Sequence, residues 1–209
     1  MYSGFYGTEF FIFVLPALAF AGFAQMKIKS TFSQYLKVSS QSGLTGAQVA
    51  RYILDRNGLT HVNIEPVRGQ LTDHYDPRKE VVRLSEGVYG GSSIAAVSVA
   101  AHEVGHAMQH AEGYVPLTLR SAIAPIANIG TRMVWIFILL GFVISPFFID
   151  VGIALFLAAV LFQIVTLPVE FNASRRAIVQ LENGIVPEGG LKPAKKVLNA
   201  AALTYVAAT

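Results

Sequence analysis

Hydrophobic and polar positions divide the chain into three long apolar runs and a mixed central region. The apolar runs cover residues 4–24, 133–149 and 151–169, and each is almost free of charged side chains. A membrane-spanning helix needs roughly 20 apolar residues, with about 17 as the lower limit. The pattern therefore predicts three transmembrane helices. A buried helical hairpin in a soluble core is the alternative for the second and third runs.

The first apolar run also has a length that a signal peptide could have. A signal peptide carries its positive charges before the apolar stretch, whereas Lys27 and Lys29 follow this run. We therefore interpret residues 4–24 as a retained transmembrane helix.

The region between the first two runs, residues 25–132, has the pattern of a small α+β domain. Residues 42–59 have helical spacing, and residues 61–67 alternate like a strand. Residues 80–89 are a second strand candidate. Residues 90–114 are rich in small and apolar side chains and predict a helix packed against its neighbours. The predicted fold class is thus a mostly α-helical membrane protein with a small α+β domain.

The chain beyond the third run, residues 170–209, is expected on the same side of the membrane as this domain. Its last part, residues 198–209, becomes apolar again. That composition fits the beginning of a fourth apolar segment.

Composition supports the membrane interpretation and limits the chemistry. Hydrophobic residues make up 53% of the 209 residues, charged residues only 14%, and the mean hydropathy is +0.50. Soluble domains carry about 25% charged residues. The chain has no cysteine, which excludes disulfides, thiolate metal sites and cysteine nucleophiles. Any metal must be held by histidine and carboxylate ligands.

The positive charges indicate an orientation in the membrane. If the chain crosses at the three apolar runs, all 16 Lys and Arg residues lie on one side, in residues 25–132 and 170–209. Basic residues favour the cytoplasmic side. We therefore expect the N-terminus outside and both of these regions in the cytoplasm.

The segment His-Glu-Val-Gly-His carries the strongest chemical signal. His102 and His106 stand one turn apart on the predicted helix, so both imidazoles can reach one cation. Glu103 projects from the same helix, where its carboxylate can take a proton from water at the metal. A helix with two hydrogen-bonding histidines and a surface glutamate is the alternative. The apolar flanks argue against it, because buried polar groups without partners are costly.

His110, which follows on the same helix, is not expected to bind this metal. It lies roughly 12 Å along the helix from His102, whereas a Zn–N bond is only about 2 Å long. His110 is more consistent with the C-terminal end of the helix, where histidine is favoured.

A third ligand is needed, because catalytic zinc is usually held by three protein groups and water. The candidates are His61, His74 and several carboxylates. Glu170 ranks first because it directly follows the third predicted span, on the side of the soluble domain.

The chain resembles the YugP-like neutral zinc metallopeptidases of bacterial membranes. The resemblance covers nearly the whole chain and includes residues 71–89, 98–114, 170–177 and 195–207. A more distant likeness is to the HtpX-like and CAAX-processing membrane proteases, in which an E-x-x-A-D helix supplies the third zinc ligand.

The resemblance implies a zincin-like domain of the gluzincin type. Its zinc ligands would be His102, His106 and Glu170, with Glu103 as the base. Ser174 stands where the more distant families have an aspartate that commonly orients a ligand histidine. Ser174 can do so only as a neutral acceptor, and Asn172 is an alternative.

The expected reaction is zinc-dependent hydrolysis of internal peptide bonds, with Glu103 as general base. Candidates for stabilising the oxyanion are Arg175, His74 and Tyr75. Zincins of this kind bind substrate along a sheet edge, and residues 81–89 are the natural candidate for that edge. An ordinary core strand is the alternative there. The residues concerned are Val82, Arg83 and Leu84.

The expected partners are zinc, the lipid bilayer and a peptide or membrane-protein substrate, with no nucleic acid. The resemblance implies a multi-pass protein of the bacterial inner membrane.

Two other functions are compatible with a metal-binding membrane protein. A non-catalytic scaffold with structural zinc leaves Glu103 without a purpose, and such sites usually have a fourth protein ligand. A transporter would need the motif inside a span, which the pattern does not predict.

Overall fold

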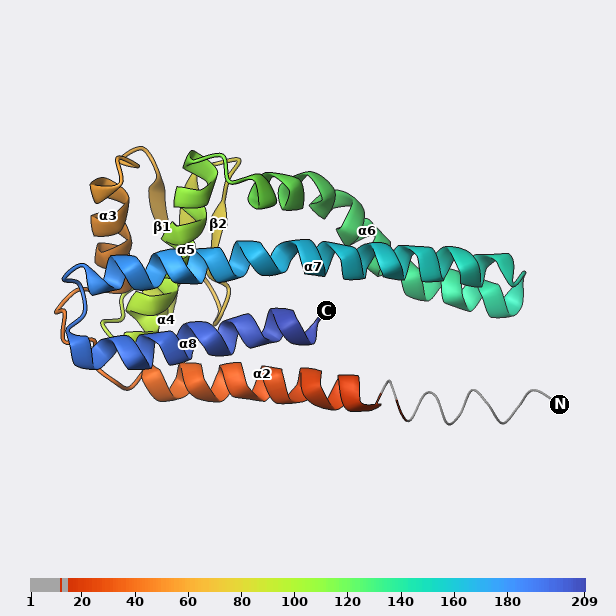
Figure 1. The fold of residues 1–209 in the computed structure, drawn as a ribbon, viewed down its shortest axis with the longest axis horizontal. Helices are drawn as coiled ribbons and strands as arrows, with labels where there is room; N and C mark the ends of the chain where they lie inside the picture. Colours follow the sequence, from red (N-terminus) through yellow and green to blue (C-terminus); the bar gives the residue numbers. More distant parts are fainter. Residues whose placement is uncertain (1–11, 13–14) are drawn as a thin grey trace.

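The computed structural model describes residue 12 and residues 15–209, which fold mainly into helices around a small sheet (Figure 1). About half of the transmembrane helix predicted at residues 4–24 lies outside these described residues. Its described part begins a helix that continues to Tyr35. In chain order, the helices and strands are α2 (Leu15–Tyr35), α3 (Gly46–Arg56), β1 (Asn63–Val67), β2 (His74–Asp76), β3 (Val81–Ser85), α4 (Glu86–Tyr89), α5 (Ile94–Ala111), α6 (Val115–Val143), α7 (Phe147–Glu182) and α8 (Glu188–Ala207).

Capping residues fix the start of two helices in the α+β domain. Thr45 and Gln48 form a reciprocal capping box at the start of α3, which satisfies backbone donors that have no partner within the helix. The Ser93 side chain accepts a hydrogen bond from the Ala96 backbone at the start of α5. The helices predicted at residues 42–59 and 90–114 are therefore confirmed, each slightly shorter than its pattern.

The sheet corrects the expectation that residues 81–89 form a substrate-binding edge. The strand order is β1-β3-β2, with β3 parallel to β1 and antiparallel to β2. Val82, Arg83 and Leu84 therefore lie in the central strand, which pairs with β1 along its whole length and with β2 at residues 81–83. The two outer strands are β1 and β2. The strand predicted at residues 80–89 ends at Ser85, because α4 follows at once.

Helix α5 lies at the centre of the domain and packs against α3, α7, α8 and the sheet. Small residues on α5 allow these close contacts, and most of the helix is buried. The core is formed by apolar side chains from α3, β3 and α5 together with the ends of α7 and α8.

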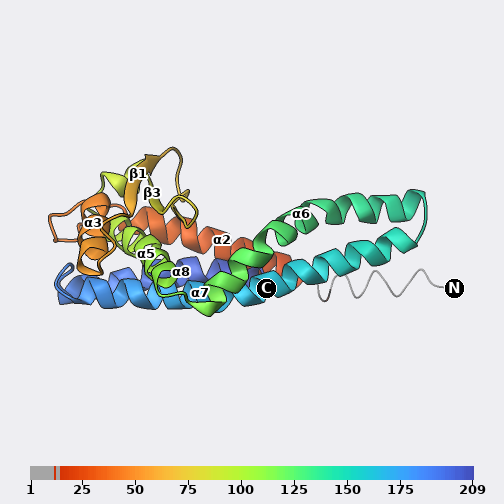
Figure 2. The same cartoon turned by 90° about the horizontal axis from the view of Figure 1, so that it is seen from above.

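Helices α6 and α7 form an antiparallel hairpin that extends away from the sheet and α3 in both views (Figure 1, Figure 2). Both helices are long and apolar enough to cross a membrane, and only 22% and 6% of their most apolar stretches are buried. Large side chains such as Trp135 and Phe142 are exposed on the hairpin. Apolar surface of this extent marks contact with a membrane or another apolar partner.

The boundaries of these helices differ from the predicted spans at residues 133–149 and 151–169. The chain turns at residues 144–146, which are Ile-Ser-Pro, inside the second predicted span, because the apolar run continues on both sides of Ser145 and Pro146. Helix α7 then continues well past residue 169. Glu170 therefore lies within a long helix instead of following its end.

Helix α8 runs alongside α2 and α7 and also contacts α5. It contains most of the apolar segment at residues 198–209. This segment thus packs against the domain and brings Tyr205 to the cavities described below.

Candidate metal centre

The side chains of His102, His106 and Glu170 converge on one point between α5 and α7. Glu170 Oε2 lies 3.2 Å from His102 Nε2 and 3.6 Å from His106 Nε2. One ligand atom from each residue lies within 4.8 Å of the others. Two imidazoles and one carboxylate are a donor set that zinc takes at catalytic sites, where a fourth position stays open. The residues therefore fit a zinc ion, and the structure brings the three predicted ligands together.

Gly105, in the middle of the His-Glu-Val-Gly-His motif, lets α5 and α7 approach closely enough for the three ligand side chains to meet. A Cβ atom on Gly105 would lie 2.7 Å from the carbonyl oxygen of Ala173. Ala173 is fully buried and lies one turn beyond Glu170 on α7. The glycine between the two histidines is thus required by the crossing that delivers the third ligand.

Each ligand histidine is oriented through its second ring nitrogen. His102 Nδ1 lies 3.2 Å from Ser174 Oγ, and His106 Nδ1 lies 3.0 Å from Gln109 Oε1. We assign Nδ1 as the donor in both contacts, so that each Nε2 lone pair faces Glu170 and a metal. Such partners fix the orientation of metal-binding histidines. Ser174 thus stands at His102 in the position considered for the missing aspartate.

Gln109 connects the metal centre to a chain of polar contacts that reaches the surface. Its Nε2 donates to the Val169 carbonyl at 2.8 Å and to Asn172 Oδ1 at 2.9 Å. These two donations orient the amide oxygen toward His106. Asn172 also accepts from Arg176 Nε at 2.7 Å, and Arg176 forms a bidentate ion pair with Glu112 at 2.6 and 2.7 Å. Asn172 therefore supports His106 through Gln109.

Glu103 lies beside the ligands and is largely buried, with 8% of its surface exposed. Burial raises the pKa of Glu103 to about 7, a rise that His102 opposes and that Glu170 and Asp73 increase. A carboxyl group with a pKa near the working pH can both accept and donate a proton.

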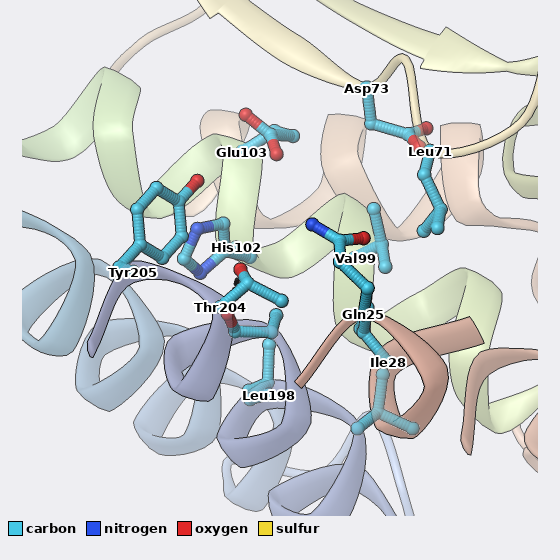
Figure 3. A pocket seen from close by; sticks show the side chains of 12 residues that line it. Gln25, Ile28, Leu71, Asp73, Val99, His102, Glu103, Leu198, Thr204 and Tyr205 are labelled. Atoms are coloured by element: carbon cyan, nitrogen blue, oxygen red, sulfur yellow. Dashed lines mark hydrogen bonds between the residues drawn. The ribbon is translucent and has the colours of Figure 1, made fainter. Parts of the chain in front are cut away.

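Two cavities meet at the metal centre and share Asp73, His102, Glu103 and Tyr205 in their walls. The first has a volume of about 270 Å³ and lies between α2, α5 and α8 (Figure 3). The second has a volume of about 390 Å³ and is bordered by β2, α5, α6 and α7. The site therefore has space on two sides of Glu103.

The other residues predicted for the site lie in different places in the structure, and only some of them border the cavities at the metal centre. His74 lines the second cavity. Tyr75 also borders it, but the Tyr75 hydroxyl bonds to His110 Nδ1 at 2.9 Å. His110 lies in the last turn of α5, as expected. Arg175 lines a different cavity between α7 and α8. His61 contacts Glu80 at 3.8 Å and is not among the clustered ligands.

Three residues at the site were missed by the sequence analysis. Gln109 follows His106 by one turn, and this helical spacing was the signal available for it. Arg120 on α6 places its guanidinium 3.7 Å from Glu170 Oε1. Burial and the nearby carboxylates of Glu170 and Glu103 raise the pKa of Tyr205, so its hydroxyl keeps its proton. The positions of Arg120 and Tyr205 depend on tertiary packing, and no local pattern marks them.

The fold and the site define a membrane-associated protein with a histidine–histidine–glutamate metal centre and a buried glutamate beside it. Comparison with known proteins gives the family. Residues 10–209 match the model of the family described as "Putative neutral zinc metallopeptidase". The chain therefore belongs to this family, as the resemblance predicted, and zinc is the metal that the family implies.

A curated relative supports the same assignment. The chain is 53% identical over 201 residues to "Putative membrane protease YugP" of Bacillus subtilis (strain 168). The aligned region covers 95% of this chain and 89% of the relative. The name of the relative agrees with the membrane association indicated by the exposed α6–α7 hairpin. No solved structure matches the chain.

Proposed function

We propose that this protein is a membrane-embedded zinc endopeptidase of the gluzincin type, with His102, His106 and Glu170 as zinc ligands and Glu103 as general base. One observation carries the proposal. The three ligand atoms converge within 4.8 Å, and Glu103 lies next to them in the wall of both cavities.

The residues around the centre have distinct parts in the proposed reaction. A zinc ion held there supplies a Lewis acid that polarises a carbonyl and makes water a better nucleophile. Glu103 takes the proton of the attacking water and passes it to the leaving amine, a role typically worth about 10²–10⁴-fold in rate. Ser174 and Gln109 hold the imidazoles in orientation. Tyr205 donates a hydrogen bond to the oxyanion, in place of the more distant Arg175.

A non-catalytic scaffold with structural zinc is the alternative, and the shape of the site argues against it. Structural zinc sites are closed by four protein ligands. Among the described residues, the cluster has three members, and it opens into two cavities. A buried carboxylate at the open side has no purpose in a purely structural site.

We further propose that the chain crosses the bacterial inner membrane three times, with the N-terminus outside and the metal centre facing the cytoplasm. The positions of the basic residues support this orientation. Gln25 borders the first cavity, directly after the predicted first span, and Phe162 of α7 borders the second. The site would thus lie at the membrane surface, which favours membrane proteins and their juxtamembrane segments as substrates.

Zinc content and cleavage of denatured casein by the purified full-length protein test the proposed function. We expect Glu103→Gln to retain zinc and lose at least about 10²-fold in cleavage rate. Glu170→Ala should lose most of its zinc, whereas Glu86→Gln, an exposed control on α4, should match the wild type. Undiminished cleavage by Glu103→Gln would contradict the proposed mechanism.

A further inference from the structure

The first cavity has an apolar end and a polar end. Ile28 of α2 and Val99 of α5 line it together with Val197, Leu198 and Ala201 of α8. At its other end are Glu103 and Asp73, and Figure 3 shows this separation, with Ile28 and Leu198 away from the two carboxylates. The apolar end thus belongs to the same cavity as Glu103, the group proposed to activate water, and the cavity wall also contains the polar side chains of Gln25 and Thr204.

The size of this cavity suits one side chain. Pockets for complete small-molecule ligands usually measure about 300–1,000 Å³, and this cavity has a volume of about 270 Å³. Ile28, Val197 and Leu198 are at most 8% exposed, so the apolar wall belongs to the packed core and is preformed.

Leu71 provides an independent observation at the border of the same cavity. It adopts a left-handed backbone conformation with φ of 56°, which is unfavourable for a residue with a branched side chain. Its side chain is also 41% exposed, so burial in the core does not compensate for the strain. Strained residues of this kind cluster at ligand-binding positions.

The loop that carries Leu71 is fixed in position next to the cavity. Asp73 accepts hydrogen bonds from the Ser85 backbone at 2.7 Å and from the Ser85 hydroxyl at 3.0 Å. This attachment to the end of β3 holds an exposed leucine where a bound side chain would cover it.

We propose that the cavity between α2, α5 and α8 is a specificity subsite that binds one large apolar side chain, such as that of leucine or phenylalanine, next to the scissile bond. Leu71 forms its lip and Ala201 part of its floor. The subsite rests on the proposed peptidase function and adds a substrate class: segments with a large apolar residue at one fixed position beside the cleaved bond.

Mapping of casein cleavage sites by mass spectrometry tests the subsite during turnover. The wild type should prefer large apolar residues at one position beside the cleaved bond. Ala201→Phe fills the cavity and should shift that preference toward glycine, alanine and serine, with unchanged zinc content. Asn199→Phe places the same side chain on the part of α8 that borders another cavity, and its cleavage map should match that of the wild type. An unchanged map for Ala201→Phe would overturn the proposal.

Peptide binding to the zinc-loaded Glu103→Gln protein in lipid nanodiscs tests the subsite without cleavage. The probes are a labelled hexa-alanine peptide and the same peptide with one leucine. The three extra carbons of leucine should strengthen binding by roughly tenfold or more. Adding Ala201→Phe should remove this difference. Equal affinities for the two peptides would refute the subsite.

Leu71→Gly distinguishes a binding role from a structural one. Glycine accepts the left-handed conformation without strain, so the thermal unfolding midpoint should stay the same or rise. The preference for the leucine peptide should nevertheless fall several-fold. An unchanged preference would count against the proposal that Leu71 contacts the bound side chain.

Cleavage mapping and peptide binding together distinguish failure of the proposed subsite from failure of the proposed peptidase function. Casein cleavage without a preferred apolar position would refute the subsite and leave the peptidase function intact. Absence of casein cleavage, together with selective binding of the leucine peptide, would support the subsite and count against the peptidase function.

Discussion

Replacement of Gly105 by alanine tests whether the close crossing of α5 and α7 assembles the metal centre. The new Cβ would lie 2.7 Å from the Ala173 carbonyl oxygen, whereas ordinary contact begins at 3.4 Å. The obstacle is backbone, so a change of side-chain rotamer cannot relieve it. The helices must therefore separate by several tenths of an ångström, or one of them must rotate.

Two opposing effects determine how Gly105→Ala changes the free energy of unfolding. Alanine gains about 1 kcal/mol over glycine from its helix propensity. Overpacking in a dense core typically costs about 1–3 kcal/mol, and contact with a backbone atom places this site at the upper end. We therefore expect the free energy of unfolding to fall by about 1–2 kcal/mol. Because Glu170 lies one turn from Ala173, zinc affinity should fall by about 10–100-fold, as it does when ligand orientation is lost.

Zinc affinity, measured by competition with a chelator, and the thermal unfolding midpoint check this prediction. Gly189→Ala is the matched control, because a Cβ there meets no atom within 4 Å. It should leave zinc affinity unchanged and leave stability equal or slightly higher. Wild-type zinc affinity in Gly105→Ala would refute the argument that the crossing positions Glu170.

Three further predictions address the ligand support, the transition state and the topology. Gln109→Leu removes the partner of His106 Nδ1 and should weaken zinc binding by about 10–100-fold; unchanged affinity in a chelator competition would refute this role. Tyr205→Phe should lower kcat for a peptide substrate by about 10²-fold or more with little change in KM or zinc content, whereas Arg175→Ala should leave kcat unaltered; the reverse result would restore Arg175 as the oxyanion donor. Reporter fusions after Lys29 and within residues 145–150 should fall on opposite sides of the membrane, and a common side would contradict the three-span topology.

The metal centre shows how far sequence analysis could reach and where it stopped. His102, Glu103 and His106 were predictable because their relation depends only on helical spacing. Glu170 is far away in the chain, and only its position after an apolar run and the family resemblance favoured it. Arg120 could not be predicted, because its position beside Glu170 follows from the packing of α6 against α7.

The fold shows the same division between local and long-range information. Helical spacing predicted α3, and the small and apolar composition of residues 90–114 predicted α5. The order of strands in the sheet was not available from the pattern, because β3 is the last strand in the chain yet lies between the other two. Apolar runs located the hairpin of α6 and α7, but not the boundary between the two helices, because apolar residues continue on both sides of the turn at Ser145 and Pro146.

Helix α7 links the exposed apolar hairpin to the candidate metal centre, because one continuous helix contains both. Its first part exposes apolar side chains such as Phe147 and Phe156, and its later part carries Glu170 and Ser174. The distance along the helix from Phe147 to Glu170 is roughly 35 Å. His102 and His106, by contrast, are fixed to α5 in the core. The geometry of the metal centre thus depends on how α7 packs against α5, where Gly105 and Ala173 leave no space between the two helices.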